Sequence, residues 1–365
     1  MKATCAIEKL KNAVSTADKM TGKNLTLPVL HSILLVAQKT SIVIRSTNLA
    51  VGIELEIPAK VELEGSVVVK GDILTQVCAS LNSAQEVTLS LENNNLTLTT
   101  LTHTTMITSL PSDEFPVLPQ VEGDQFEIKT PILADGIRSV SFAAAISEIK
   151  PEIASVYIYG EEGTLYLVAT DSFRLAEKKI QNKHIPDISK LLIPFKNIGE
   201  LLRALDAAGD IVVVSYNKNQ VSIQGKGVYF TSRLIDGGFP PYHLIIPKEE
   251  TTKVVVMKQE LLSTLKLSNI FADKFMQVMF TVDPHTKKLI ISSKNSDIGS
   301  SESVVDAVIQ GKDIQVVCNL KYFLDVFQAL SGDSVSLSFT EPNKPIVVRS
   351  VSDTSFLYLL MPANR

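Results

Sequence analysis

The sequence predicts an α+β fold in which three similar domains follow one another along the chain. A Thr-Ser pair recurs at positions 108, 231 and 354, each 123 residues after the one before. Segments with the apolar spacing of a helix end at Leu81, Leu205 and Leu330. Each segment leads into a strand of alternating apolar and polar residues. Different elements therefore repeat together at nearly one interval, which is the pattern of a repeat architecture.

Each repeat continues with a hairpin. The first strands begin VTLSL, VVVSY and VSLSF, and the turns that follow read ENNN, NKNQ and EPNK. Upstream, SIVIRSTNLAVGIELEI in the first repeat aligns with TLYLVATDSFRLAEKKI in the second, with Ser46, Ala169 and Ser292 in equivalent places. We expect two helices and antiparallel sheets per domain, with domains at 1–122, 123–248 and 249–365.

Composition narrows the class of protein. The 365 residues are 45% apolar, enough for a large core, and nothing near Met1 resembles a signal peptide. Since no apolar run approaches the roughly 18 residues that span a bilayer, we expect a cytoplasmic protein without membrane contact. Cys5, Cys78 and Cys318 lie far apart and are expected to be reduced core residues. No metal-ligand spacing or nucleotide-binding motif is visible, so no metal and no cofactor are expected.

The stretch TLYLVATDSFRL, residues 164–175, is an apolar strand that ends abruptly in Thr170, Asp171, Ser172, Phe173 and Arg174. Such residues can form a catalytic cluster, frame a pocket or simply make a turn. Because RSTNLAV occupies the same place in the first repeat, a turn or bulge is expected there whatever the function, and Asp171 is expected to be structural. The residues that the second repeat adds, 172–174, are the better functional candidates.

The helical segment 194–205 carries Lys196 and Arg203 on the face opposite its apolar side, together with Glu200. Exposed cations on a helix usually serve only solvation, and a net charge of −4 argues against tight binding of nucleic acid. Three repeats without a catalytic motif leave three function classes open: an interaction scaffold, a ring or filament that continues across chain contacts, and an enzyme with a site between repeats.

Several motifs narrow this choice by their order and spacing. They are TLPVL at 26–30, VATDSFRLA at 168–176, FPPYHLIIP at 239–247, NLKYFLDVFQAL at 319–330 and YLLMPANR at 358–365. Together they resemble the bacterial sliding clamps, the β subunits of DNA polymerase III. The resemblance implies a non-catalytic processivity factor: a head-to-tail dimer closed into a ring, each chain forming half, with helices facing a hole that encircles duplex DNA. Weak contacts that ignore sequence suit a protein that slides.

The resemblance also implies partners and site residues. The partners are duplex DNA, the DNA polymerase III α subunit, the clamp loader and other proteins that carry a clamp-binding motif. The residues expected to approach DNA are Lys23, Asn24, Ser147, Lys150, Lys196 and Arg203. Those expected at the dimer contact are Val77, Thr105, Ile107, Ile270 and Phe271. The wall of a pocket for partner peptides would comprise Ile153, Thr170, Ser172, Phe173, Arg174, Leu175, Pro240, Leu244, Ile245, Asn319, Tyr322, Ile346, Leu359, Leu360, Met361 and Pro362.

The chain also departs from the pattern of this family. Ser172-Phe173 stands where Gly-His is common, which changes the expected motif preference of the pocket. At the dimer contact, charged positions have become Thr102 and Thr104 on one side and Ser300 and Ser303 on the other. Two alternatives stay open: a hydrolase or transferase that uses residues 170–172, and a clamp-like protein that has left replication, such as a plasmid, phage or drug-resistant copy.

Overall fold

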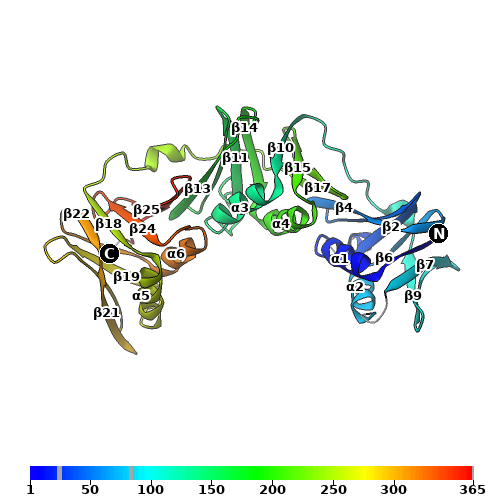
Figure 1. Ribbon diagram of the computed structural model, residues 1–365, viewed down its shortest axis with the longest axis horizontal. Coiled ribbons are helices and arrows are strands. Elements are labelled where there is room, and N and C mark those ends of the chain that lie inside the picture. Colours follow the sequence, from blue (N-terminus) through cyan, green and yellow to red (C-terminus); the bar gives the residue numbers. More distant parts are fainter. Residues whose placement is uncertain (23–26, 82–84, 364–365) are drawn as a thin grey trace. The chain divides into compact units, whose positions relative to one another are not determined.

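The computed structural model describes residues 1–22, 27–81 and 85–363. The chain divides into two compact units, each assembled from two stretches of sequence. Unit 1 comprises Met1–Ala134 and Lys196–Leu234, and unit 2 comprises Asp135–Phe195 and Ile235–Arg365. Figure 1 follows the elements along the chain from blue to red.

Within the described residues there are two α-helices per repeat, as the sequence predicts. The α-helices are α1 (Ile7–Asp18), α2 (Gly71–Ser80), α3 (Thr130–Ser141), α4 (Ile198–Ala207), α5 (Lys258–Ile270) and α6 (Leu320–Asp325). Short 3-10 helices are η1 (Pro28–His31), η2 (Ser112–Glu114), η3 (Phe195–Asn197), η4 (Tyr242–Ile245) and η5 (Val326–Gln328). In α1, the buried residues Ile7, Leu10, Val14 and Ala17 follow the helical period and form one face.

Unit 1 is built on one continuous antiparallel sheet of 13 strands. In spatial order the strands are β10 (Asp124–Lys129), β15 (Ile211–Tyr216), β16 (Gln220–Gly225), β17 (Val228–Arg233), β4 (Val51–Pro58), β3 (Ser41–Thr47), β2 (Ser32–Gln38), β6 (Gly65–Lys70), β9 (Thr104–Leu110), β8 (Asn95–Thr99), β7 (Glu86–Glu92), β1 (Lys2–Ala6) and β5 (Lys60–Leu63). The sheet passes from the first repeat into the second where β4 pairs with β17.

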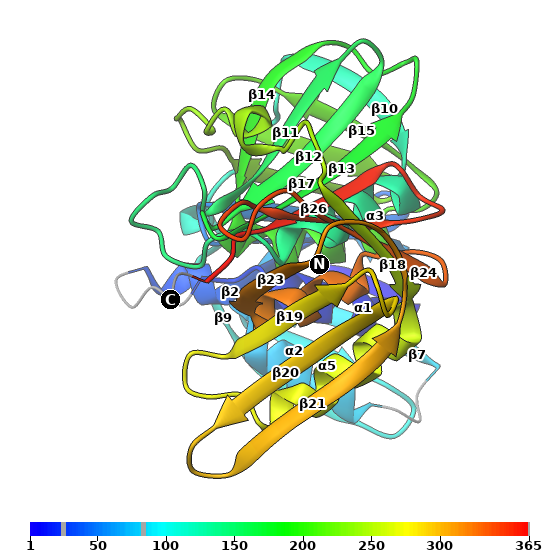
Figure 2. The ribbon, with the colours of Figure 1, turned by 90° about the vertical axis from the view of Figure 1, so that its left-hand side faces the viewer.

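Unit 2 contains two antiparallel sheets. The first has the order β14 (Ile188–Pro194), β11 (Ser155–Glu161), β12 (Thr164–Thr170), β13 (Arg174–Gln181), β26 (Phe356–Leu360), β25 (Ile346–Ser350), β24 (Ser334–Phe339), β18 (Thr252–Met257) and β22 (Val308–Gly311). The second has the order β21 (Gly299–Asp306), β20 (Lys288–Asn295), β19 (Gln277–Asp283) and β23 (Ile314–Asn319). Helix α5 lies against β20 and β21 (Figure 2). Along β24, Val335, Leu337 and Phe339 are buried and alternate with serines, so one face of this strand is core.

The structure confirms the repeat and corrects its register. Strands β3, β12 and β20 begin 123 and 124 residues apart. Ser46 Oγ donates to the Ala17 carbonyl of α1 at 2.6 Å, and Ser293 Oγ donates to the Ser268 carbonyl of α5 at 2.8 Å. The third counterpart of Ser46 is therefore Ser293, and the prediction of Ser292 was wrong by one position.

The Thr-Ser pair is equivalent in only two repeats. It lies within β9 and within β17, but Thr354 and Ser355 lie in the turn before β26. Strand pairing gives the correct alignment of the third repeat. Ser232 of β17 pairs with Val51, and Leu360 of β26 pairs with Arg174, so Leu360 and not Ser355 is the counterpart of Ser232. Longer connections between β24, β25 and β26 shift the third repeat along the chain.

The described residues contain no membrane-spanning helix, no metal-binding cluster and no disulfide. No described helix combines the length and the apolar character needed to cross a membrane. Across the same residues, no group of three His, Cys, Asp or Glu side chains is placed to hold a metal ion. Cys5, Cys78 and Cys318 are buried and form no disulfide. Burial raises the pKa of the Cys5 thiol to about 12 and that of Cys78 to about 11, so both behave as core residues.

Candidate functional site

The turn between β12 and β13 is built by its own polar side chains. Thr170 Oγ1 donates to the Arg174 carbonyl at 2.6 Å and accepts from the Ser172 N–H at 3.2 Å. Asp171 Oδ1 accepts the N–H groups of Phe173 and Arg174 at 2.9 and 3.0 Å. The prediction that Asp171 is structural is confirmed. With Thr170 and Asp171 engaged in this way, the Thr170 hydroxyl is not a free nucleophile and the Asp171 carboxylate is not a free base.

The side chain of Arg174 corrects an expectation. The family resemblance implies that Arg174 lies in the wall of the peptide pocket, but its side chain is only 8% exposed. Its Nε donates to Asp171 Oδ2 at 3.0 Å and its Nη1 to Asp325 Oδ2 at 2.5 Å, while the guanidinium lies 4.4 Å from the ring centroid of Tyr322. Burial acts to lower the pKa of Arg174, but the Asp325 hydrogen bond and the nearby Asp171 and Asp325 charges raise it above its ordinary value. Arg174 is thus a charged link inside unit 2, not a free donor.

An exposed apolar surface lies beside this link. Phe173 is 61% exposed, and its ring stacks near that of Tyr322 with centroids 6.4 Å apart. The Met361 N–H donates to the Phe173 carbonyl at 2.8 Å, which holds the end of the chain against the turn. Asn319 Oδ1 caps α6 by accepting the Tyr322 N–H at 3.1 Å. The structure therefore brings Phe173, Tyr322, Met361 and Asn319 together, and we call these four residues the aromatic platform.

Several of the predicted pocket residues are buried in the core of unit 2. Leu175 and Leu359 are each 1% exposed and belong to one buried cluster with Tyr242 and Val347. Sequence position alone does not separate such floor residues from wall residues. The predicted pocket residues that are buried are Ile153, Thr170, Arg174, Leu175, Ile346, Leu359 and Leu360. Asn319, Tyr322, Met361 and Pro362 are half-buried, whereas Ser172, Phe173, Pro240, Leu244 and Ile245 are exposed.

Three residues around this site are not among those predicted from the sequence. Asp325 lies three residues after Tyr322 on α6, a spacing that could have indicated a shared helix face. Phe142 places its ring centroid 5.8 Å from the Arg174 guanidinium. Phe275 is 61% exposed, and its carbonyl accepts a long hydrogen bond of 3.5 Å from Asn319 Nδ2. No local pattern announces Phe142 or Phe275, because their partners are distant in sequence.

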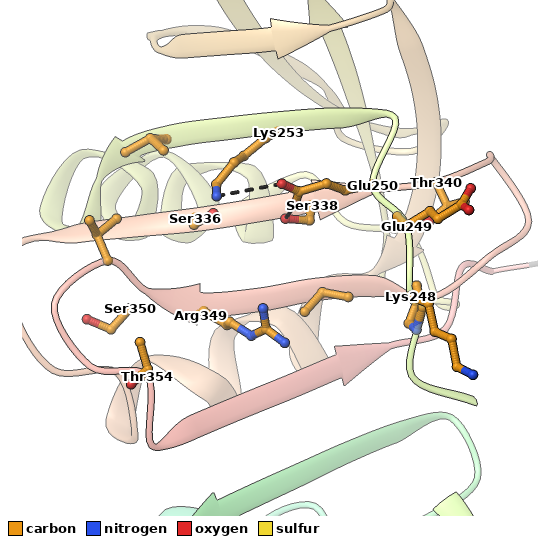
Figure 3. Close-up of a pocket in the computed structure, with 14 residues that line it drawn as sticks. Lys248, Glu249, Glu250, Lys253, Ser336, Ser338, Thr340, Arg349, Ser350 and Thr354 are labelled. Carbon is orange, nitrogen blue, oxygen red and sulfur yellow. Dashed lines mark hydrogen bonds and ion pairs between the residues drawn. The ribbon is translucent and has the colours of Figure 1, made fainter. Parts of the chain in front are cut away.

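Unit 2 also has a polar groove on the face of β18, β24 and β25, beside the segment 247–250 (Figure 3). The groove has a volume of about 450 Å³. Ser338 Oγ donates to Glu250 Oε2 at 2.6 Å, and Lys253 lies 3.7 Å from Glu250. Its lining is rich in Ser, Thr, Lys and Glu and includes none of the predicted pocket residues. The groove is therefore distinct from the predicted pocket for partner peptides.

The residues predicted to approach DNA are distributed over both units. Lys196 and Arg203 are exposed on η3 and α4, and Arg203 Nη1 lies 3.9 Å from Glu200 Oε1. Ser147 and Lys150 are exposed in the connection between α3 and β11. Lys23 and Asn24 fall outside the described residues. The role of all six in DNA contact remains a prediction.

The residues predicted at the dimer contact differ in exposure. Ile270 is 62% exposed, and Val77, Thr105 and Phe271 are half-buried. Ile107 is only 5% exposed, so its side chain packs in the core of unit 1. The role of these five residues in a dimer contact remains a prediction. Alternation along β9 instead exposes Met106, at 65%.

Several strands keep an open edge within the described residues, and two of them, β9 and β21, carry residues predicted at or near the dimer contact. Strand β9 pairs with β8 over Thr104–Thr108, but β6 reaches only Ser109 and Leu110 on its other side. Strand β21 pairs with β20 alone. Open edges present unpaired backbone groups to which another chain can add.

Comparison with known proteins finds similar sequences and structures over the whole chain. Models of the DNA polymerase III β subunit match in order: the N-terminal domain over residues 1–119, the central domain over 127–241 and the C-terminal domain over 243–364. The β sliding clamp of Bacillus subtilis is 29% identical over 378 residues, covering 100% of both proteins. The solved structure of a DNA polymerase sliding clamp from Bacillus subtilis matches with a TM-score of 0.94 at 27% identity, covering 100% of this chain and 99% of the other. The DNA polymerase III β subunit from Thermotoga maritima matches with a TM-score of 0.93 at 27% identity and the same coverage. The chain therefore belongs to the DNA polymerase III β subunit family.

Proposed function

We propose that the chain is a sliding clamp, a non-catalytic subunit that tethers the replicative polymerase to duplex DNA in the cytoplasm. The observation that carries the proposal is the similarity over its full length to proteins named as sliding clamps, at a TM-score of 0.94. Two copies, each of three domains bounded as the sequence predicts, close a ring around DNA without reading its sequence. Retention by topology requires no strong phosphate contacts, which agrees with a net charge of −4.

The open edges of β9 and β21 support a head-to-tail dimer. Pairing the edge of one chain with that of the other satisfies backbone groups on both and closes the assembly. Because Thr102, Thr104, Ser300 and Ser303 carry no charge, we expect dimerisation to depend little on salt. Sedimentation at low and high salt tests this directly, and a chain that stays monomeric at micromolar concentration would contradict it.

The aromatic platform, together with the exposed Leu244 and Ile245, supports a binding site for short apolar peptides. Leu244 is 82% exposed and Ile245 is 49% exposed, so both large apolar side chains are accessible to a partner. An extended peptide is recognised by apolar contacts and a few fixed polar groups, and Asn319 and Tyr322 supply the latter. Partners of this kind would be the DNA polymerase III α subunit, the clamp loader and other proteins with a clamp-binding motif.

The experiment that tests the clamp function uses the shape of the DNA. The chain is loaded on nicked circular duplex by a clamp loader and then washed at high salt. We expect it to stay bound to the circle and to leave once the circle is cut, because a ring slides off a free end. A protein held by ordinary phosphate contacts would show the opposite behaviour, leaving at high salt whether or not the DNA is cut.

A further inference from the structure

The segment that carries Leu244 and Ile245 is anchored on one face of the nine-stranded sheet of unit 2. We call this segment, residues 239–247, the strap; it is yellow-green in Figure 1. Tyr242 at the start of η4 is 3% exposed and packs in a cluster with side chains of β11, β12, β13, β25 and β26. Phe239 and Ile246 pack against the same cluster. The single turn η4 thus buries its first side chain and leaves Leu244 and Ile245 exposed.

A chain of hydrogen bonds fixes the buried end of this turn. Tyr242 Oη donates to Glu177 Oε2 at 2.5 Å, Tyr159 Oη lies 2.9 Å from Tyr242 Oη, and His243 Nε2 lies 3.1 Å from Tyr159 Oη. Each phenol has one proton. Since Tyr242 uses its proton on Glu177, Tyr159 must donate to Tyr242, and His243 Nε2–H must donate to Tyr159. All three bonds then point toward the one carboxylate.

Glu177 is the last acceptor in this series of hydrogen bonds, and it is 2% exposed. Its other oxygen lies 3.4 Å from Lys179 Nζ, so the buried charge has a partner. Burial and the hydrogen bond to Glu177 raise the pKa of Tyr242, which keeps the phenol protonated and donating. A charged acceptor makes this a stronger bond than one between neutral groups.

A stack of aromatic rings is the second contact between the strap and the sheet. Phe239 lies 4.7 Å from Tyr157, Tyr157 lies 5.0 Å from Tyr159, and Tyr159 lies 4.5 Å from Tyr166, each measured between ring centroids. Tyr157 and Tyr159 belong to β11 and Tyr166 to β12. The stack fixes where the strap begins, whereas the Tyr242–Glu177 bond fixes the rotation of η4.

We propose that Glu177 is a positioning residue for peptide binding: by holding Tyr242 it presets η4 so that Leu244 and Ile245 form a ready apolar wall. The inference rests on the proposed peptide site. A preset wall binds more tightly because its side chains need not be ordered when the peptide arrives. Glu177 touches no peptide in this account and acts through Tyr242.

The test compares variants at both ends of the bond. Tyr242→Phe removes only the hydroxyl, Glu177→Leu removes the acceptor, and Glu177→Gln keeps an oxygen that can accept from Tyr242. Glu161→Leu on the same sheet is the matched control, since Glu161 is exposed at the end of β11. The probe is a synthetic clamp-binding peptide of the polymerase α subunit, and the readouts are affinity by calorimetry and amide hydrogen exchange over residues 239–247.

We expect Tyr242→Phe and Glu177→Leu to lower affinity by about tenfold and to speed exchange in the strap. Glu177→Gln should retain most of the affinity, and Glu161→Leu all of it. Unchanged affinity in folded Tyr242→Phe overturns the inference, and this milder variant decides the question if Glu177→Leu does not fold. If the unmodified chain binds no peptide, the proposed peptide site fails and the inference with it; if it binds and the variants bind equally, only the inference fails.

Discussion

The turn after β3 and the turn after β12 have the same backbone and different surroundings. In the first, Thr47 Oγ1 donates to the Val51 carbonyl at 2.7 Å, and Asn48 Oδ1 accepts the N–H groups of Ala50 and Val51, both at 2.9 Å. Thr170 and Asp171 make the same bonds in the second. The central residues, Leu49 and Ser172, share a left-handed φ of 72° and 78°.

The difference that gives the two turns different surroundings lies in their last two residues. Phe173 replaces Ala50 and Arg174 replaces Val51. The first turn ends in an ordinary apolar core residue, whereas the second places an exposed ring beside Tyr322 and sends a guanidinium inward to Asp325. The Thr-Asx pair is thus shared by the first two repeats, and the last two positions of the turn differ between them.

The largest expected effect comes from Arg174. Arg174→Ala should lower the free energy of unfolding by about 3 kcal/mol, because the largely buried Asp171 would lose its guanidinium partner and Asp325 would keep only its longer 3.4 Å contact with Lys321 Nζ. Urea unfolding followed by circular dichroism measures this loss. The variant Asp171→Asn/Arg174→Val/Asp325→Leu gives positions 171 and 174 the residues of the first turn and removes the carboxylate of Asp325, and it should be more stable than Arg174→Ala. Wild-type stability in Arg174→Ala would show that the link is not needed.

The second effect concerns peptide binding. Phe173→Ala gives the second turn the side chain found at Ala50 and should weaken binding of a polymerase-derived clamp-binding peptide about thirtyfold, or about 2 kcal/mol, by removing an aromatic contact. Thermal stability should be unchanged, because Phe173 is 61% exposed. Phe173→His is the control, which we expect to change peptide preference more than the best affinity. Calorimetry that finds equal affinity in Phe173→Ala would remove the aromatic platform from the binding site.

The shared part of the turns gives a smaller effect. Asn48→Ala and Asp171→Ala each remove the acceptor of two backbone N–H groups, and each should cost about 1–2 kcal/mol of unfolding free energy. Asp171→Ala should cost more, since it also breaks the Arg174 pair. Asp171→Asn keeps the turn acceptor, as Asn48 does, and should fall between wild type and Asp171→Ala. Equal losses for Asp171→Asn and Asp171→Ala would mean that the turn bonds contribute little.

The smallest effect tests Lys178 in β13, which occupies the place of Leu55 in β4. Lys178 Nζ lies 3.0 Å from Asp353 Oδ2, and Ser355 donates to Asp353 Oδ1. Burial acts to raise the pKa of Asp353, but the Ser355 and Lys178 contacts lower it to about 2. A lowered carboxylate pKa stabilises the fold above the unfolded value of about 4, and this contribution is lost as pH falls through about 2.

Asp353→Asn should therefore cost about 1 kcal/mol at neutral pH, allowing for solvent screening. The difference from wild type should shrink as the pH falls from about 4 toward 2. Urea midpoints measured at several pH values give this profile. A difference that stays constant over this range would assign the loss to packing and not to the charge.

The sequence by itself determined the repeated elements. Helical spacing placed α2, α4 and α6, alternation placed the hairpins after them, and comparison of the first two repeats predicted the turn at Asp171. These features follow from short-range physics: the helical and strand periods, and hydrogen bonds from a side chain to backbone two or three residues away. The same local logic predicted that the three cysteines are buried core residues.

Only the tertiary structure decided which distant segments meet. Arg174 and Asp325 are 151 residues apart, and Tyr242 and Glu177 are 65 apart, so no period relates them. The inward side of Ile107 depends on the register of β9, because a shift of one residue in a strand exchanges its two faces. In the third repeat, longer connections between the strands let β26 pair with β13 five residues later than the Thr-Ser spacing predicts. Long-range pairing is selected by the packing of whole sheets, which local sequence patterns do not encode.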